Sequence, residues 1–203
     1  MPIWRTGALA ACLLLACASA PVVTNPSHAH SVRLADAGPP RATGKIIALY
    51  PRTVDAQALA IAGGEPAGDL HLTLVDFGYD LNGADDSPLQ QRLADLTGPD
   101  THPIQARVFG YAIFNPKTGP AGTAVVYLVG DSPDLAPVRD QLVKLAQQVV
   151  QLPDQHEPWI PHITAAYGPS DAVLTYAGPV VFDRIGLIWE GHTTYFPLGA
   201  PGS

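Results

Sequence analysis

The order of apolar and polar positions predicts alternating short strands and amphipathic helices over residues 45–198. Apolar runs, or apolar residues at every second position, predict strands where Pro, Gly or Asn bounds them. The expected strands lie at 46–50, 70–77, 104–114, 122–129, 159–167, 180–189 and 193–198. A turn-forming segment, Asn115-Pro116-Lys117-Thr118-Gly119, joins strands 104–114 and 122–129, so these two should pair as a hairpin.

Apolar residues at three- and four-residue spacing predict three helices. The first covers 54–62 and stops at Gly63-Gly64, and the second opens at Ser87-Pro88 and stops at Gly98. The third begins at Asp134 and carries an apolar stripe made of Leu135, Val138, Leu142, Leu145 and Val149. Because the helices are interleaved with strands that follow one another directly in pairs, we expect antiparallel sheets and the fold class α+β.

The first 44 residues differ in character from the rest of the chain. Arg5 precedes an apolar run, Ala8–Ala16, which is too short to span a membrane but suits an export signal. We therefore predict a signal peptide over 1–17 and a flexible tether, rich in Pro, Ala, Ser and Gly, over 18–44. A folded domain is expected over 45–203.

Two processing patterns compete at the end of the predicted signal. Leu14-Leu15-Ala16-Cys17 resembles a bacterial lipobox, in which Cys17 is lipidated and anchors the chain to a membrane. Ala18-Ser19-Ala20 resembles the cleavage site of a secreted protein, although Pro21 fits that pattern poorly. A misassigned start codon is a third explanation. We expect an exported protein, either a cell-envelope lipoprotein or a secreted one.

Charge and cysteine content narrow the chemistry. The 203 residues include 11 Lys and Arg against 18 Asp and Glu, a net charge of −7. An acidic surface repels a long nucleic-acid duplex, whereas a nucleotide or short oligonucleotide can still bind in a locally neutral cleft. Both cysteines, Cys12 and Cys17, lie in the predicted signal. The folded domain therefore has no disulfide, thiol nucleophile or cysteine metal site.

A short internal repeat pairs histidine with threonine on two predicted strands. Residues 69–78 read DLHLTLVDFG, and residues 160–168 read IPHITAAYG. Side chains two residues apart on a strand share a face, so His71 lies beside Thr73, and His162 beside Thr164. Each strand thus presents an imidazole next to a hydroxyl, with the intervening apolar residue facing the core. A third triplet, His192-Thr193-Thr194, follows Gly191 and is interpreted as a turn between strands.

With these two motifs, the opening strand Ile46–Pro51 and the segment Trp159–Thr164, the chain resembles the two-histidine phosphoesterase superfamily. Within it, the chain is most similar to the 2′-5′ RNA ligase, or LigT-like cyclic phosphodiesterase, branch. The resemblance spans roughly residues 45–198. It implies a LigT-like fold, with two pseudo-symmetric lobes of antiparallel sheet and flanking helices around a central cleft. Each lobe is expected to supply one His-x-Thr strand.

The resemblance also implies an activity: a monomeric phosphodiesterase that opens 2′,3′-cyclic phosphates of nucleotides or short RNA ends and needs no metal or other cofactor. One imidazole would deprotonate water while the other protonates the leaving ribose oxygen, since imidazole titrates near neutral pH. Thr73 and Thr164 would donate hydrogen bonds to the phosphate oxygens. The catalytic set is therefore predicted as His71, Thr73, His162 and Thr164.

Five further side chains are candidates for contact with the substrate. Tyr50 and Arg52 end the first strand, and Arg52 is the candidate phosphate contact, with a solvated turn arginine as the alternative. Trp159 and Tyr167 are candidate surfaces for stacking a base, as is Tyr195, with an ordinary core aromatic as the alternative for each.

Two other classes of function stay open. A metallohydrolase could draw on the 7 histidines, although no His-Glu-x-x-His motif is present. A catalytically inactive, envelope-attached module could use the same cleft to hold a nucleotide or another ligand. A phosphodiesterase that acts on cyclic oligonucleotide signals would differ from the first hypothesis in substrate alone.

Overall fold

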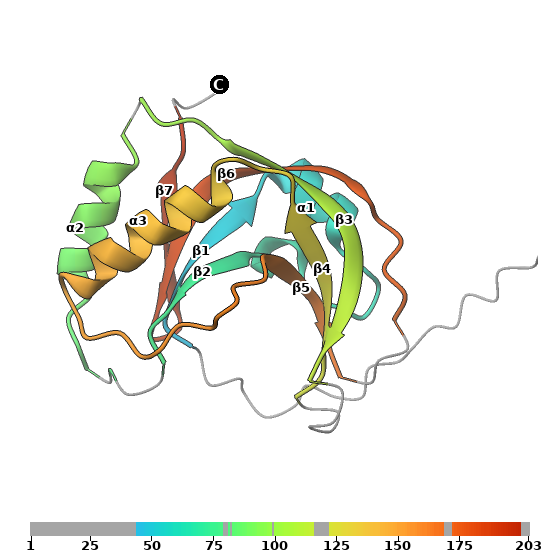
Figure 1. Ribbon diagram of the computed structural model, residues 1–203, viewed down its shortest axis with the longest axis horizontal. Helices are drawn as coiled ribbons and strands as arrows, with labels where there is room; N and C mark the ends of the chain where they lie inside the picture. The colour runs from blue at the N-terminus through green and yellow to red at the C-terminus, as the bar shows by residue number, and fades with distance from the viewer. Residues whose placement is uncertain are drawn as a thin grey trace, which may run out of the picture. The chain divides into compact units, whose positions relative to one another are not determined.

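The computed structural model describes residues 44–78, 81, 83–98, 100–115, 122–168 and 172–199. Seven strands form one antiparallel sheet (Figure 1). They are β1 (Ile46–Pro51), β2 (Leu72–Asp76), β3 (Ile104–Phe114), β4 (Ala124–Gly130), β5 (His162–Tyr167), β6 (Gly178–Trp189) and β7 (His192–Pro197). The predicted signal and tether, with Cys17, lie outside the described residues, apart from Gly44.

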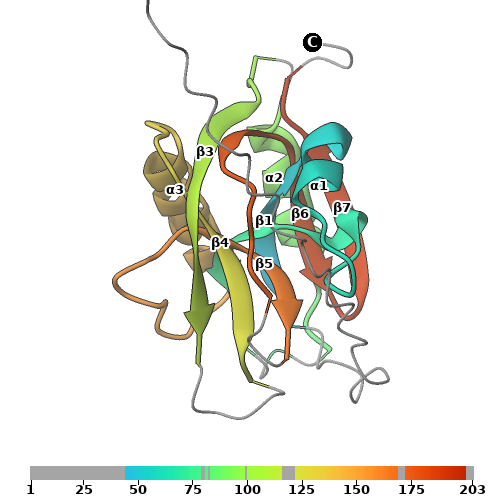
Figure 2. The same ribbon diagram turned by 90° about the vertical axis from the view of Figure 1, so that its right-hand side faces the viewer.

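The strand order brings the two His-x-Thr segments side by side. Along the sheet the order is β1-β2-β5-β4-β3-β6-β7, and β6 pairs with β1 as well. One edge of β6 therefore meets β1, and its other edge meets β3 and then β7. Six strands form a closed ring in this way. Figure 2 shows the long β3–β4 hairpin beside β5, which confirms the predicted hairpin.

Three helices and one 3₁₀ turn complete the α+β fold predicted from the sequence. These are α1 (Thr53–Leu59), η1 (Ala67–Asp69), α2 (Ser87–Leu96) and α3 (Leu135–Gln147). In Figure 1, α2 and α3 lie together on one side, and α3 packs on β2. The predicted apolar stripe of α3 faces the core, where Leu135 and Leu142 are buried. Over the described residues, no helix is long and apolar enough to cross a membrane.

Several predicted boundaries were wrong, each because of a tertiary contact or a turn. Helix α1 ends at Leu59 instead of 62, since the Tyr127 hydroxyl donates to the Leu59 carbonyl at 3.0 Å and Ala60 is extended. The strands predicted at 70–77 and 159–167 are shorter, so His71 lies one residue before β2.

The triplet His192-Thr193-Thr194 was also misassigned, because it begins strand β7 and is not a turn. The turn is made by the two residues before it, Glu190 and Gly191, whose φ angles are 48° and 82°. Trp189 and His192 face each other as a cross-strand pair across this two-residue loop. Two consecutive residues with positive φ are typical of the tight turns that join antiparallel strands.

Candidate active site

The two His-x-Thr segments meet across the β2–β5 pair. Leu72 faces Ile163 in the register, and both side chains are completely buried. Antiparallel pairing then places His71 opposite Thr164 and Thr73 opposite His162. All four polar side chains are half-buried. By strand alternation they share the face opposite to Leu72 and Ile163. There the two histidines lie on one diagonal and the two threonines on the other, related by the local two-fold axis of the strand pair.

Both imidazoles are held in the same way. Nδ1 of His71 lies 2.6 Å from the Asp69 carbonyl oxygen, and Nδ1 of His162 lies 2.7 Å from the Ile160 carbonyl oxygen. A carbonyl oxygen only accepts, so each Nδ1 carries the hydrogen and donates it. This arrangement assigns the tautomer and makes Nε2 the nitrogen that can take up or release a proton in each ring.

The environment of His71 favours its neutral form. Burial lowers the pKa of the His71 imidazole below its ordinary value of 6.5. The hydrogen bond to Asp69 and the charges of Glu65 and Asp69 oppose this shift, and the nearby His162 adds to it. At neutral pH the lone pair on Nε2 of His71 is therefore ready to accept a proton.

An aromatic and cationic cluster lies beside His71. The ring centroid of Tyr50 is 5.6 Å from that of His71, and the Tyr195 ring stands edge-on to Tyr50 at 5.0 Å. The Arg184 guanidinium lies over both tyrosine rings, 5.6 Å from Tyr50 and 5.2 Å from Tyr195. Burial raises the pKa of the Tyr50 phenol, so this group stays protonated at neutral pH.

A glycine makes room for this tyrosine. Gly186 on β6 faces Ala48 on β1 and Tyr195 on β7. A Cβ atom at Gly186 would lie 2.4 Å from Cε2 and 2.9 Å from Cδ2 of Tyr50. The ring thus occupies the space that any other side chain on β6 would need, which fixes the ring against His71.

His162 has a different aromatic neighbour. The ring of Phe114, at the end of β3, lies 4.8 Å from the imidazole with an interplanar angle of 63°. Sequence reasoning missed both Phe114 and Arg184. Their alternation on long strands was visible, but no local pattern tied either residue to a histidine distant in the chain.

The remaining predicted substrate contacts are placed as follows. Tyr50 lies at the site, whereas the fork of Arg52 binds Asp55, with Nε–Oδ2 at 2.9 Å and Nη2–Oδ1 at 3.2 Å. Trp159 lies under the guanidinium of Arg139 and packs against the core. Tyr167 ends β5 and is 38% exposed. The structure thus gives Arg52 and Trp159 structural contacts and brings Tyr50 to His71.

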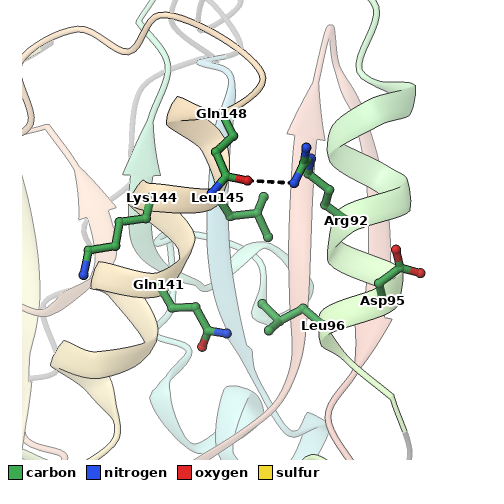
Figure 3. A pocket seen from close by; sticks show the side chains of 7 residues that line it. All are labelled: Arg92, Asp95, Leu96, Gln141, Lys144, Leu145 and Gln148. Atoms are coloured by element: carbon green, nitrogen blue, oxygen red, sulfur yellow. Dashed lines mark hydrogen bonds between the residues drawn. The ribbon is translucent and has the colours of Figure 1, made fainter.

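A separate groove of about 410 Å³ lies between α2 and α3 (Figure 3). Its lining residues are Arg92, Asp95, Leu96, Gln141, Lys144, Leu145 and Gln148. Nη1 of Arg92 donates to Oε1 of Gln148 at 2.8 Å. None of these residues belongs to the His-x-Thr motifs, so the groove is distinct from the candidate active site. In the part of the chain that the structure describes, no group of three His, Cys, Asp or Glu side chains could hold a metal ion.

Comparison with known proteins places the chain in a family and a fold. The family model of the 2′-5′ RNA ligase superfamily matches residues 57–189, a range that includes both motifs. The structure is similar to the crystal structure of TT0787 of Thermus thermophilus, with a TM-score of 0.54 and 19% identity over 78% of this chain and 100% of that one. It is also similar to E. coli LigT complexed with 3′-AMP, with a TM-score of 0.48 and 18% identity over 77% and 95%. No curated protein matches the chain significantly.

Proposed function

This chain belongs to the 2′-5′ RNA ligase superfamily, and from that premise we propose that it opens 2′,3′-cyclic phosphates of nucleotides or short RNA ends. The observation that carries the proposal is the matched pair of imidazoles on one face of the sheet. Each donates Nδ1–H to a backbone carbonyl and keeps Nε2 for proton transfer. Two such groups around one phosphate can supply the base and the acid of an in-line displacement.

The proposed reaction is hydrolysis by a water molecule. Nε2 of His71 takes a proton from water as the water oxygen forms a bond to phosphorus. The bond between phosphorus and one ribose oxygen breaks, and His162, protonated at Nε2, gives its proton to that oxygen. We assign His71 as the base because burial lowers its pKa and keeps it neutral. The product is a ribose phosphate monoester. One proton has moved from water to His71, and another from His162 to the ribose oxygen.

The threonines supply the charge-stabilising part of the proposal. In the β2–β5 register each threonine stands opposite the histidine of the other motif. Their hydroxyls can donate to the non-bridging phosphate oxygens as negative charge builds up there. A phosphate centred among these four side chains would have one imidazole and one hydroxyl from each of the two motifs beside it.

Hydrolysis of the four nucleoside 2′,3′-cyclic monophosphates tests the proposal. The assay uses the purified full-length chain in excess EDTA, beside His71→Ala and His162→Ala. Each variant should lose about 10²–10⁴-fold in rate, the usual contribution of one general acid or base. The matched control is His192→Ala, which removes an exposed histidine from the third His-x-Thr triplet and should keep wild-type activity.

The outcomes separate the competing functions. Near wild-type turnover in either motif variant would contradict two-histidine catalysis. Turnover in a parallel assay without EDTA, but none in excess EDTA, would favour a metallohydrolase. A folded wild-type chain without turnover would favour cyclic oligonucleotide substrates, to be assayed next, and then an inactive ligand-binding module.

A further inference from the structure

The two carbonyls that orient the imidazoles are held by different means. Asp69, the partner of His71, ends the η1 turn, and its own N–H donates to the Pro66 carbonyl at 2.9 Å. Ile160, the partner of His162, lies in the segment 148–161, which contains no helix or strand. We call this segment the pre-β5 segment. Its last residue, Pro161, accepts a hydrogen bond from the Val129 N–H of β4 at 3.0 Å, so the sheet backbone anchors the chain after Ile160. The chain before Ile160 is held by side-chain contacts.

Arg139 on α3 supplies one such set of contacts. Its Nη2 lies 2.9 Å from Oε1 of Glu157 and 3.4 Å from the His156 carbonyl oxygen. Its Cζ lies 5.0 Å from the centre of the Trp159 ring, so the guanidinium stacks on the residue that directly precedes Ile160. Arg139 is only 8% exposed. A buried guanidinium depends on its partners, and here all of these partners belong to the pre-β5 segment.

Gln155 ties the same segment to the strand that carries Thr73. Its Oε1 accepts from the Asp76 N–H at 3.0 Å, and its Nε2 donates to the Asp76 carbonyl at 2.8 Å. The amide thus binds the end of β2 much as a neighbouring strand would. Because α3 also packs on β2, Arg139 and Gln155 connect the pre-β5 segment to one support.

We propose that Arg139 is a positioning residue for His162. By holding Glu157 and Trp159 it fixes the Ile160 carbonyl, and that carbonyl fixes the Nδ1–H tautomer and the direction of the His162 ring. Arg139 acts through these residues and does not touch the substrate. The same contacts make Trp159 a structural partner of Arg139. The kinetic consequence rests on the function proposed above, whereas the effect on the tautomer does not.

The direct test is long-range ¹H–¹⁵N NMR of the imidazoles in the ¹⁵N-labelled full-length chain. Spectra are recorded at about pH 8.5, two units above the ordinary histidine pKa. His71→Gln and His162→Gln assign the two signals. In Arg139→Met we expect His162 to shift from the Nδ1–H form to a mixture of tautomers while His71 is unchanged. Lys144→Met, which removes an exposed cation from the same helix, should leave both signals in place.

Kinetics with a cyclic mononucleotide give the second readout. Arg139→Met should lower kcat by about 10²-fold, the scale expected when a distant change misplaces a reacting group, and should leave KM nearly unchanged. Arg139→Lys keeps a positive charge for Glu157 but lacks the planar guanidinium that stacks on Trp159. Its kcat should therefore lie between those of the wild type and Arg139→Met.

Several results would overturn the proposal. One is an unchanged His162 tautomer in folded Arg139→Met. Another is an equal change in the signals of His71 and His162, which would indicate a general loss of packing instead of a specific effect on His162. If Arg139→Met fails to fold, Trp159→Leu carries the same expectation, and an unchanged His162 signal there has the same meaning. A selective shift at His162 in a chain that hydrolyses no cyclic phosphate would support the positioning role and contradict the proposed function.

Discussion

At the scale of single residues, the His-x-Thr motif brings part of its own orientation with it. In both copies the carbonyl that binds Nδ1 belongs to the residue two positions upstream of the histidine. Such a contact forms between residues that are close in the chain, and it decides which ring nitrogen can transfer a proton. The two rings differ in their surroundings, because Tyr50 lies against His71 and Phe114 against His162.

The buried environment of His71 predicts a pH dependence. Because its pKa is lowered from 6.5, the neutral base persists below that pH, and the acid limb of kcat/KM should have its midpoint below 6.5. Between the folded-state pKa and 6.5 the unfolded chain binds more protons, so this group makes the free energy of unfolding rise with pH in that window. A pH–rate profile and urea unfolding of wild type and His71→Gln check both effects. A midpoint at or above 6.5, or the same pH dependence of unfolding in His71→Gln, would contradict this account of His71.

The threonine hydroxyls predict a smaller loss than the imidazoles. Thr73→Val and Thr164→Val keep the β-branched shape and remove the donor. Each should lower kcat by about 10²–10³-fold, the range found when one oxyanion donor is removed. Steady-state assays against Thr194→Val, a β7 threonine outside the motifs, measure the effect. Wild-type kcat in the Thr73→Val/Thr164→Val double variant would exclude a phosphate role.

At the scale of elements, the three neighbouring strands β2, β1 and β6 position the residues around His71. Strand β1 lies between β2 and β6, so Tyr50 reaches His71 on one side while Arg184 covers its ring from the other. Because Gly186 has no side chain, the Tyr50 ring can pack directly over the backbone of β6. The position of Tyr50 therefore depends on the register of two strand pairs as well as on its own rotamer.

Gly186→Ala tests this arrangement. The new methyl group would lie 2.4 Å from a buried aromatic carbon, so the ring or the strand must move. We expect a loss of about 1–3 kcal/mol in the free energy of unfolding, as for other overpacked cores, together with a lower kcat/KM. Urea denaturation and steady-state assays measure the two quantities. Gly110→Ala on β3 meets no atom within 4 Å and is the control. Unchanged stability and rate in Gly186→Ala would show that the Tyr50 ring has room to move.

At the scale of the whole molecule, ring closure and net charge set the conditions for the site. Pairing of β6 with β1 and with β3 joins the first and last parts of the described chain and closes the ring of strands in which β2 and β5 are direct neighbours. The chain carries a net charge of −7. Such a charge opposes the approach of polyanions and favours substrates with few phosphates.

The net charge predicts an unusual salt dependence for longer substrates. For an oligonucleotide with a 2′,3′-cyclic end, kcat/KM at low ionic strength should be no higher than for the mononucleotide, and it should rise with added salt as repulsion is screened. Proteins that bind nucleic acid through Lys and Arg show the opposite slope. Assays of both substrates across ionic strength provide the comparison. A steep fall of kcat/KM with salt for the oligonucleotide would reveal a basic binding surface.

The sequence by itself determined the local features of this protein. The β3–β4 hairpin and the apolar stripe of α3 follow from spacing and turn residues, and both formed, although α3 ends at Gln147, before the last predicted stripe residue, Val149. Alternation likewise decided that Leu72 and Ile163 are buried while the motif histidines and threonines take the other face. These outcomes depend on neighbours a few residues away, so a pattern in the chain is enough to predict them.

Only the tertiary structure decided which residues surround the histidines. The residues that surround or support them come from four different elements: Phe114 from β3, Arg184 from β6, Tyr195 from β7 and Arg139 from α3. Each makes its contact through strand register or helix packing, which no local spacing in the sequence encodes. The end of α1 at Leu59 depends in the same way on Tyr127, 68 residues further along the chain. Long-range contacts of this kind are chosen by the packing of the whole core, and so the site's environment could be known only once the sheet had closed.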